Sequence, residues 1–459
     1  HPSTISRSYR AGMAQRAWGS GVEITRRKSE VQVRRLARKG GGGDVLESAT
    51  GVNDQIVPSF SANLTSQWLG TLYTAAVSLG LTFVLGRVLG PEGFGSYSYI
   101  LTLATLFFIL QDGGFRTLLF REKTLSTPAM ADLRNRLFSW ALGHTVIITM
   151  AGAFFVLILP VQYRAGILAA VLCFGFQAWA NFISSELRGE GLFPREAVWQ
   201  VTVRSLGAVG ILLALFFVRP EPWAIFAGWA LGLLLSLLLS PMRLERPRFD
   251  GFGFHDIRRA CFGFMAIDAA TTIYYRSDII LLAHVTGDSA EVGYYAAAYR
   301  FLDGIVLFAA PLGLIWFRKL RLAWEEKRLF GSQVVRMSMV MLGAAALVVV
   351  GGVLYSKEIV LLAFGQGYVA SATVLPWLLA ALIFILPNGV LTQAAIAQNI
   401  EHLYAVAAGA AALVNIGLNF VLIPRFGGLG AAWATIVTET FLTIVLVLGL
   451  TGKLKKPGF

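Results

Sequence analysis

From residue 59 onward, long runs of hydrophobic residues alternate with short polar turns. Most runs approach the roughly 20 residues that an α-helix needs to cross a hydrocarbon core about 30 Å thick. The runs are continuous, whereas the strands of a membrane β-barrel alternate between apolar and polar residues. The pattern therefore predicts an all-α polytopic membrane protein with twelve transmembrane helices, at residues 64–86, 94–111, 137–159, 166–187, 198–218, 222–241, 260–284, 292–317, 333–354, 371–397, 403–423 and 428–450.

The composition agrees with this class. Hydrophobic residues make up 56% of the chain and charged residues 14%, and the mean hydropathy of +0.65 is too high for a water-soluble domain. The loops are too short for a catalytic domain, so we expect a transporter and not an enzyme. The chain lacks a Gly-x-x-x-x-Gly-Lys-Ser/Thr motif, and its five histidines and two cysteines are scattered. We therefore predict no nucleotide-hydrolysing site, no metal site and no cofactor.

Positive charge follows the predicted topology. The net charge is +13, and the loops after spans 2, 4, 6 and 8 contain seventeen Lys and Arg, against five in the loops after odd-numbered spans. Positive loops stay in the cytoplasm, so both termini are predicted to be cytoplasmic. The same distribution accounts for the excess charge outside the N-terminal tail, which argues against nucleic acid as a partner.

The two ends of the chain are basic. Residues 1–58 contain ten Lys and Arg and four consecutive glycines, and we predict a disordered basic tail. Three interpretations stay open for it: a solvated extension or upstream sequence read through in frame, attraction to anionic lipid head groups, and an organellar transit peptide. Residues 453–459 are predicted to be a basic cytoplasmic tail.

The turns after spans 1 and 7 resemble each other. Gly90 corresponds to Gly287, and Gly95 lies 198 positions before Gly293. An offset near half the twelve-helix region predicts two six-helix lobes, residues 59–243 and 244–452. Such parallel repeats are related by an axis along the membrane normal, and we expect a central cavity between them. The alternative is that a glycine-rich turn followed by tyrosine is simply a good interfacial hairpin.

These segments resemble the polysaccharide transport family, the O-antigen and oligosaccharide repeat-unit flippases. The larger superfamily also holds the multidrug and toxic compound extrusion (MATE) exporters and the lipid II flippases. The resemblance extends over almost all of residues 60–450 and is carried by residues 86–97, Asp112–Gly114, Arg121–Glu122, Tyr275–Asp278, Val292–Arg300, Phe364–Tyr368, Asn415–Asn419 and 422–432.

The resemblance implies a MATE-like fold that flips undecaprenyl-diphosphate-linked oligosaccharide repeat units across the bacterial cytoplasmic (inner) membrane. It implies ion-coupled alternating access, driven by a proton or sodium gradient, for surface polysaccharide biosynthesis. The expected partners are the lipid-linked substrate, membrane lipids, a polysaccharide polymerase and glycosyltransferases. The alternative function is an ion-coupled exporter of small cationic or amphiphilic compounds, which would use acidic residues in its cavity.

Charged residues inside the predicted spans are the candidate functional residues, because a charge in the bilayer is costly unless it faces protein, water or a partner. Arg276 and Arg300 are predicted at one depth on adjacent helices, where they could bind a diphosphate or an acidic sugar. Arg204 would line the inner half of the cavity, or its guanidinium would reach the membrane surface along an extended side chain. In the alternative, Arg300 pairs with Asp303, three residues along its helix. The candidates for proton or cation coupling are Asp268, Asp278, Asp303 and Glu439.

A second charged group lies at the predicted cytoplasmic end of span 2. It could form a salt-bridged gate that closes the inner face, or it could be ordinary positive-inside loop charge. We call it the gate group, and its members are Asp112, Arg116, Arg121 and Glu122.

Overall fold

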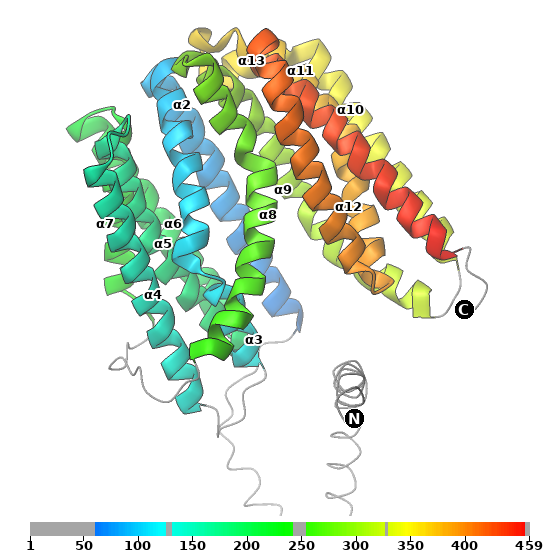
Figure 1. Cartoon of the computed structure of the whole chain (residues 1–459), viewed down its shortest axis with the longest axis horizontal. Helices are drawn as coiled ribbons and strands as arrows, with labels where there is room; N and C mark the ends of the chain where they lie inside the picture. The colour runs from blue at the N-terminus through cyan, green and yellow to red at the C-terminus, as the bar shows by residue number, and fades with distance from the viewer. Residues whose placement is uncertain (1–59, 125–130, 242–253, 326–328, 455–459) are drawn as a thin grey trace, which may run out of the picture. The chain divides into compact units, whose positions relative to one another are not determined.

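The structure is a computed structural model, and it describes residues 60–124, 131–241, 254–325 and 329–454. All regular secondary structure in these residues is helical (Figure 1). The predicted tail at residues 1–58, most of the C-terminal tail and the predicted lobe boundary at residue 243 lie outside the described residues. The elements are α2 (Phe60–Asp112), α3 (Phe115–Thr124), α4 (Ala131–Ile158), α5 (Arg164–Gly189), α6 (Phe193–Leu213), a π-helical turn (Ala214–Val218), α7 (Pro222–Leu238), α8 (Phe254–Thr286), α9 (Ser289–Glu325), α10 (Phe330–Phe364), a 3₁₀ turn (Gln366–Tyr368), α11 (Ser371–Ala380), α12 (Leu382–Ala397) and α13 (Glu401–Leu454).

Seven helical segments in the described part of the chain are long and apolar enough to cross a membrane. The protein is thus an all-α polytopic membrane protein. Each of the twelve predicted runs overlaps a helix or pair of helices, and the number of crossings stays a prediction.

Two helices are too long for a single crossing, and both are broken by a glycine. At 1.5 Å per residue, the 53 residues of α2 would extend about 80 Å, more than twice the hydrocarbon thickness. Gly90 interrupts α2 with φ of 66°, and Gly427 interrupts α13 with φ of 54°, a backbone conformation that glycine adopts without steric cost. Gly287, which corresponds to Gly90 in the predicted repeat, has φ of 64° and separates α8 from α9. A glycine with positive φ therefore lies at each of the two corresponding turns.

Helices of each half pack mainly with one another. In the first half, α7 packs against α5 and α6, and in the second half α13 packs against α8 and α12; Figure 1 shows both groups. Gly210 and Gly228 bring α6 and α7 close together, because a Cβ atom on either glycine would overlap the carbonyl oxygen of the other. Small residues are the usual means of such close helix packing in membranes.

The two halves meet through a reciprocal contact between α2 and α9. A Cβ atom at Gly95 would overlap the carbonyl of Ser289, and one at Gly293 would overlap the carbonyl of Pro91. The offset of 198 positions relates Pro91 to Ser289 and also relates Gly95 to Gly293. The two contacts are thus reciprocal, since each glycine meets the residue that corresponds to the neighbour of the other. The division into two six-helix lobes stays a prediction.

Candidate functional site

Arg276 and Arg300 converge on one carboxylate. The Nη1 atom of Arg276, on α8, lies 3.4 Å from Oδ2 of Asp303, and Nη1 of Arg300 lies 3.2 Å from the same oxygen. Arg300 and Asp303 share a face of α9 because they are three residues apart. The Arg300–Asp303 pair of the alternative interpretation forms, and tertiary packing brings Arg276 to it, while a role of the two arginines in binding substrate stays a prediction. Two guanidinium groups on one carboxylate leave one positive charge uncompensated in this trio, which we call the arginine cluster.

The arginine cluster is half-buried and retains binding capacity. The exposed fractions of the side chains are 26% for Arg276, 16% for Arg300 and 33% for Asp303. Nε of Arg300 is buried and has no hydrogen-bond partner among the described residues. The ring of Tyr299 lies 5.8 Å from the Arg276 guanidinium carbon and supports its charge. Because guanidinium groups bind carboxylate and phosphate oxygens bidentately, the cluster can bind an anionic ligand.

Asp278 and Glu439 lie deeper, with exposed fractions of 4% and 3%. Asp278 accepts a hydrogen bond from the hydroxyl of Tyr295. Glu439 accepts one from the hydroxyl of Tyr274 and another, of 2.8 Å, from the amide of Asn388. Polar but uncharged donors therefore satisfy both carboxylates, as burial requires. These donors carry no charge and belong to other spans, so the sequence pattern does not single them out.

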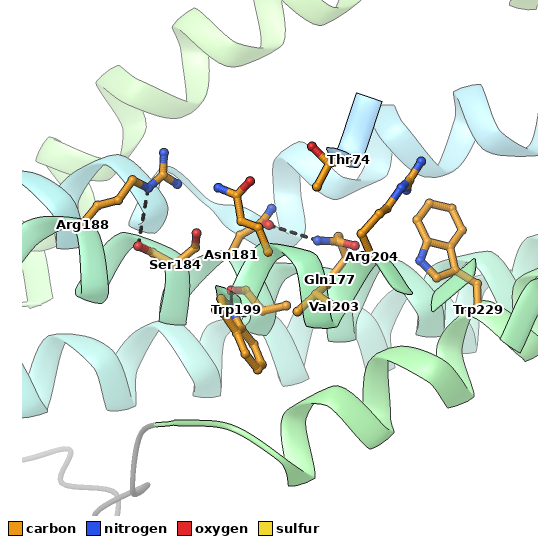
Figure 2. Close-up of a pocket in the computed structure, with 11 residues that line it drawn as sticks. Thr74, Gln177, Asn181, Ser184, Arg188, Trp199, Val203, Arg204 and Trp229 are labelled. Atoms are coloured by element: carbon orange, nitrogen blue, oxygen red, sulfur yellow. Dashed lines mark hydrogen bonds between the residues drawn. The ribbon is translucent and has the colours of Figure 1, made fainter. Parts of the chain in front are cut away.

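Arg204 belongs to a different site, a cavity of about 240 Å³ formed by α2, α5, α6 and α7 (Figure 2). Its guanidinium donates a hydrogen bond to the hydroxyl of Ser78 on α2. The structure does not place Arg204 in the arginine cluster, because its hydrogen-bond partner lies on α2.

Three residues that line this cavity, Ser184, Arg188 and Gln200, contact a buried acid that the sequence pattern does not single out. Glu196 is fully buried and accepts hydrogen bonds from the side chains of Ser184, Gln200 and Gln67. Its Oε1 atom lies 3.4 Å from Nε of Arg188. The sequence does contain a signal for one of these contacts, since Glu196 and Gln200 are four residues apart and therefore share a face of α6.

The gate group contacts the second half of the chain. Nη2 of Arg116 lies 3.1 Å from Oδ2 of Asp268 on α8, and its Nε lies 4.0 Å from Oδ1 of Asp112. Asp268, predicted as a coupling residue, is thus brought to the gate group. Gly114, with φ of 80°, packs against the carbonyl of Cys261 and allows the two chain segments to approach closely. The charged groups at the end of α2 therefore connect the two halves.

The two other members of the gate group lie on α3. The Arg121 guanidinium carbon lies 5.4 Å from the ring centre of Phe264 on α8, a cation–π contact. Glu122 is part of α3, and its side chain lies outside the described residues. Beneath these contacts, Phe115 and Leu118 of α3 pack in a hydrophobic cluster that also contains Cys261. Ionic and apolar contacts therefore act together at this junction.

Known proteins resemble this chain in both sequence and fold. Over 280 residues it is 25% identical to the succinoglycan biosynthesis transport protein ExoT of Rhizobium meliloti, a match that covers 57% of this chain and 55% of that protein. The chain thus spans about half the length of this curated relative.

Solved structures share the fold. A lipid II flippase MurJ in an inward closed conformation matches with a TM-score of 0.70 and 14% identity, covering 84% of this chain and 87% of that one. An inward-facing multidrug resistance MATE family transporter matches with a TM-score of 0.66 and 12% identity, covering 84% and 96%. At these identities the likeness describes the fold alone. The family described as "Polysaccharide biosynthesis protein" matches residues 60–317, more than half of the chain. The chain therefore belongs to the polysaccharide biosynthesis protein family.

Proposed function

We propose that this protein flips polyprenyl-diphosphate-linked oligosaccharide repeat units from the inner to the outer leaflet of the bacterial cytoplasmic membrane, for surface polysaccharide biosynthesis. The observation that carries the proposal is the arginine cluster, in which Arg276 and Arg300 share the single carboxylate of Asp303, so that guanidinium groups outnumber carboxylates within the cluster. Membership of the polysaccharide biosynthesis family supports the glycan part of the substrate. Similarity to a succinoglycan transport protein and to a lipid II flippase supports transport.

The charge of the cluster favours a lipid diphosphate over a cationic drug. A diphosphate presents several oxygens to two adjacent guanidinium groups, an arrangement that Arg binds bidentately. A cationic compound would be repelled by Arg276 and Arg300, because the one carboxylate between them is already shared. The arginine cluster therefore has the wrong sign of charge to bind the cationic substrates of a drug exporter.

Transport in this proposal proceeds by alternating access, and the Arg116–Asp268 pair closes the cytoplasmic side. Both termini are taken to be cytoplasmic, and the polymerase and glycosyltransferases of the pathway are the expected partners. Asp278 and Glu439 are the proposed coupling residues, since their donors are neutral and the carboxylates can take up a proton or sodium ion deep in the protein. Asp303 is less suited to coupling, because it already neutralises one arginine.

Exchanging the charges of the gate pair tests the gate. Arg116→Asp and Asp268→Arg should each open the junction, because each places like charges together, and the double exchange should restore it. The native thiol of Cys261 reports the opening, since it is 5% exposed beside Gly114. The measurement uses inside-out vesicles, a Cys173→Ser background and a maleimide that does not cross the membrane. We expect labelling to be roughly fivefold faster in each single variant, because the Arg116–Asp268 pair stabilises the closed junction by up to about 1 kcal/mol. Equally fast labelling of the double variant would contradict the gate.

Lipid analysis and reconstitution test the function itself. Deleting the gene should cause complete lipid-linked repeat units to accumulate on the inner leaflet, and purified protein in liposomes should move such a lipid between leaflets. A proton gradient and a sodium gradient are then imposed in separate experiments, and only the gradient of the coupling ion should change the rate of lipid flipping. An unchanged lipid pool, together with liposomes that do not flip the lipid, would refute the proposal.

A further inference from the structure

The cavity beside Arg204 is separate from the arginine cluster and has the composition of a carbohydrate site. Its volume of about 240 Å³ is below the range of about 300–1,000 Å³ for drug-sized ligands, which leaves room for a single sugar ring. Its walls combine side-chain amides, indole rings and two guanidinium groups, and Figure 2 shows them on neighbouring helices around one space. Nothing in the flipping mechanism above uses this cavity.

The side-chain amides of the cavity are oriented by hydrogen bonds that leave half of their donor and acceptor groups free. Nε2 of Gln177 donates to Oδ1 of Asn181 at 3.0 Å, and the two residues share a face of α5. This bond uses one polar atom of each amide, and the carbonyl of Gln177 and the amino group of Asn181 remain to accept from and donate to a ligand. Gln200 is held in the same way by the buried carboxylate of Glu196. Paired donors and acceptors on rigid helices suit the hydroxyl groups of a sugar.

Two tryptophans give the cavity rigid apolar surfaces. Gly207 leaves room for the indole of Trp229, because a Cβ atom there would lie 3.1 Å from that ring. The ring of Phe226 stacks against the same indole at 6.3 Å. Trp199 is fixed by a 3.0 Å hydrogen bond from its Nε1 to the carbonyl of Ala180. The C–H faces of a pyranose pack on such indole surfaces, while its hydroxyl groups reach the amides.

The charge of the cavity specifies an acidic sugar. Arg188 is neutralised by Glu196, at 3.4 Å. Arg204 donates to a neutral partner, Ser78, its Nε is buried without a hydrogen-bond partner, and it has no carboxylate partner among the described residues. One unpaired guanidinium in a partly buried cavity favours an anionic ligand, because the ligand supplies the missing counter-charge.

We infer that this cavity binds one sugar unit of the transported glycan, a unit that carries a carboxylate, and that Arg204 binds that carboxylate. This inference rests on the proposed function, since it names the class of glycan. Gln177, Asn181 and Gln200 bind the hydroxyl groups, and Trp229 packs against the ring. Glu196 is a positioning residue, which acts by holding Arg188, Ser184 and Gln200 in place.

Saturation-transfer NMR on the full chain in nanodiscs tests the binding without any transport. Glucuronate should show a saturable signal with at least tenfold higher affinity than glucose, and inorganic phosphate should not displace it at equal concentration. Equal affinity for the two sugars, no saturable signal, or displacement by phosphate alone would overturn the inference. The comparison uses only the native protein, so it does not depend on how well a variant folds.

Substitution then locates the site. Arg204→Gln should weaken glucuronate binding about tenfold to a hundredfold, since a hydrogen bond to a charged group is worth about 1.5–3 kcal/mol. The matched control is Arg219→Gln, which changes an exposed arginine at the turn between α6 and α7 that pairs with Glu221. Unchanged affinity in Arg204→Gln, or an equal loss in the control, would overturn the assignment.

Flipping assays separate this inference from the proposed function. With two lipid diphosphates, one bearing an acidic glycan and one a neutral glycan, Arg204→Gln should slow the acidic substrate at least tenfold more than the neutral one. Equal slowing of both would overturn the inference and leave the flippase proposal standing. If the native protein flips neither lipid, the proposed function fails, while the sugar-binding measurement is judged separately.

Discussion

Replacing both Arg276 and Arg300 with glutamine should reduce flipping of a diphosphate-linked oligosaccharide by more than about a hundredfold. Each single replacement should cost about tenfold to a hundredfold, since charge-assisted hydrogen bonds are worth about 1.5–3 kcal/mol each. The charge of the cluster falls from one positive to zero in each single variant and to one negative in the double variant. The initial rate of flipping in liposomes is the measurement.

Two further variants show whether the charge of the cluster causes this loss. Asp303→Asn raises the net charge of the cluster by one, so it should lower the apparent KM for the lipid and also slow release, which lowers the turnover rate. Arg164→Gln is the matched control, because Arg164 is exposed at the start of α5 and its guanidinium donates, within the described part of the chain, only to the carbonyl of Leu159. Flipping at the native rate in the double arginine variant would eliminate the cluster as the diphosphate site.

Replacing Gly95 with valine should nearly abolish transport by preventing the contact between α2 and α9. A Cβ atom at this position would overlap the carbonyl of Ser289 and crowd the amide nitrogen of Gly293, both of which are backbone atoms that cannot rotate away. Overpacking of this kind costs about 1–3 kcal/mol. That cost would reduce the population of the state with this contact by roughly fivefold to more than a hundredfold, and a transporter must visit each of its states.

Thiol labelling measures this shift directly. The hydroxyl of Ser289 lies 2.9 Å from that of Tyr163 across the same junction, so Ser289→Cys, in a chain without other cysteines, should be labelled faster when Gly95→Val is added. The control is Gly80→Val on the same helix, where a Cβ atom meets nothing within 4 Å. If Gly95→Val behaves like this control in both labelling and flipping, the glycine contact is not part of the transport cycle.

The arginine cluster and the cavity beside Arg204 occupy different places in the molecule, and we propose that they bind different parts of one large amphipathic substrate. In the proposed function the arginine cluster on α8 and α9 binds the diphosphate, and the cavity formed by α2, α5, α6 and α7 binds a sugar. A substrate that bridges the two sites would thus contact both halves of the chain, which is what alternating access requires of a transported molecule.

Part of the candidate site could be predicted from local sequence. Arg300 and Asp303 are three residues apart, and helical geometry alone places them on one face of α9. The partner of Arg276 could not be found in this way, because Asp303 is 27 positions distant and lies on another helix. The same limit applies to Asp268, which is 152 positions from Arg116 and joins the gate group only through the packing of α3 against α8.

The sequence by itself determined the class of this protein, the positions of its long hydrophobic runs, the glycine breaks at Gly90 and Gly287 and the resemblance between the turns that follow spans 1 and 7, but not the short helix α3 or the division of residues 371–397 into α11 and α12. These properties depend on hydrophobic run length, backbone freedom and spacing along one chain, all of which are local. Only the tertiary structure decided which charges meet, which carboxylates are satisfied by neutral donors, and that Arg204 borders a cavity of its own. Those outcomes depend on how helices far apart in sequence rotate and pack, because a buried polar group must find its partner wherever packing places one.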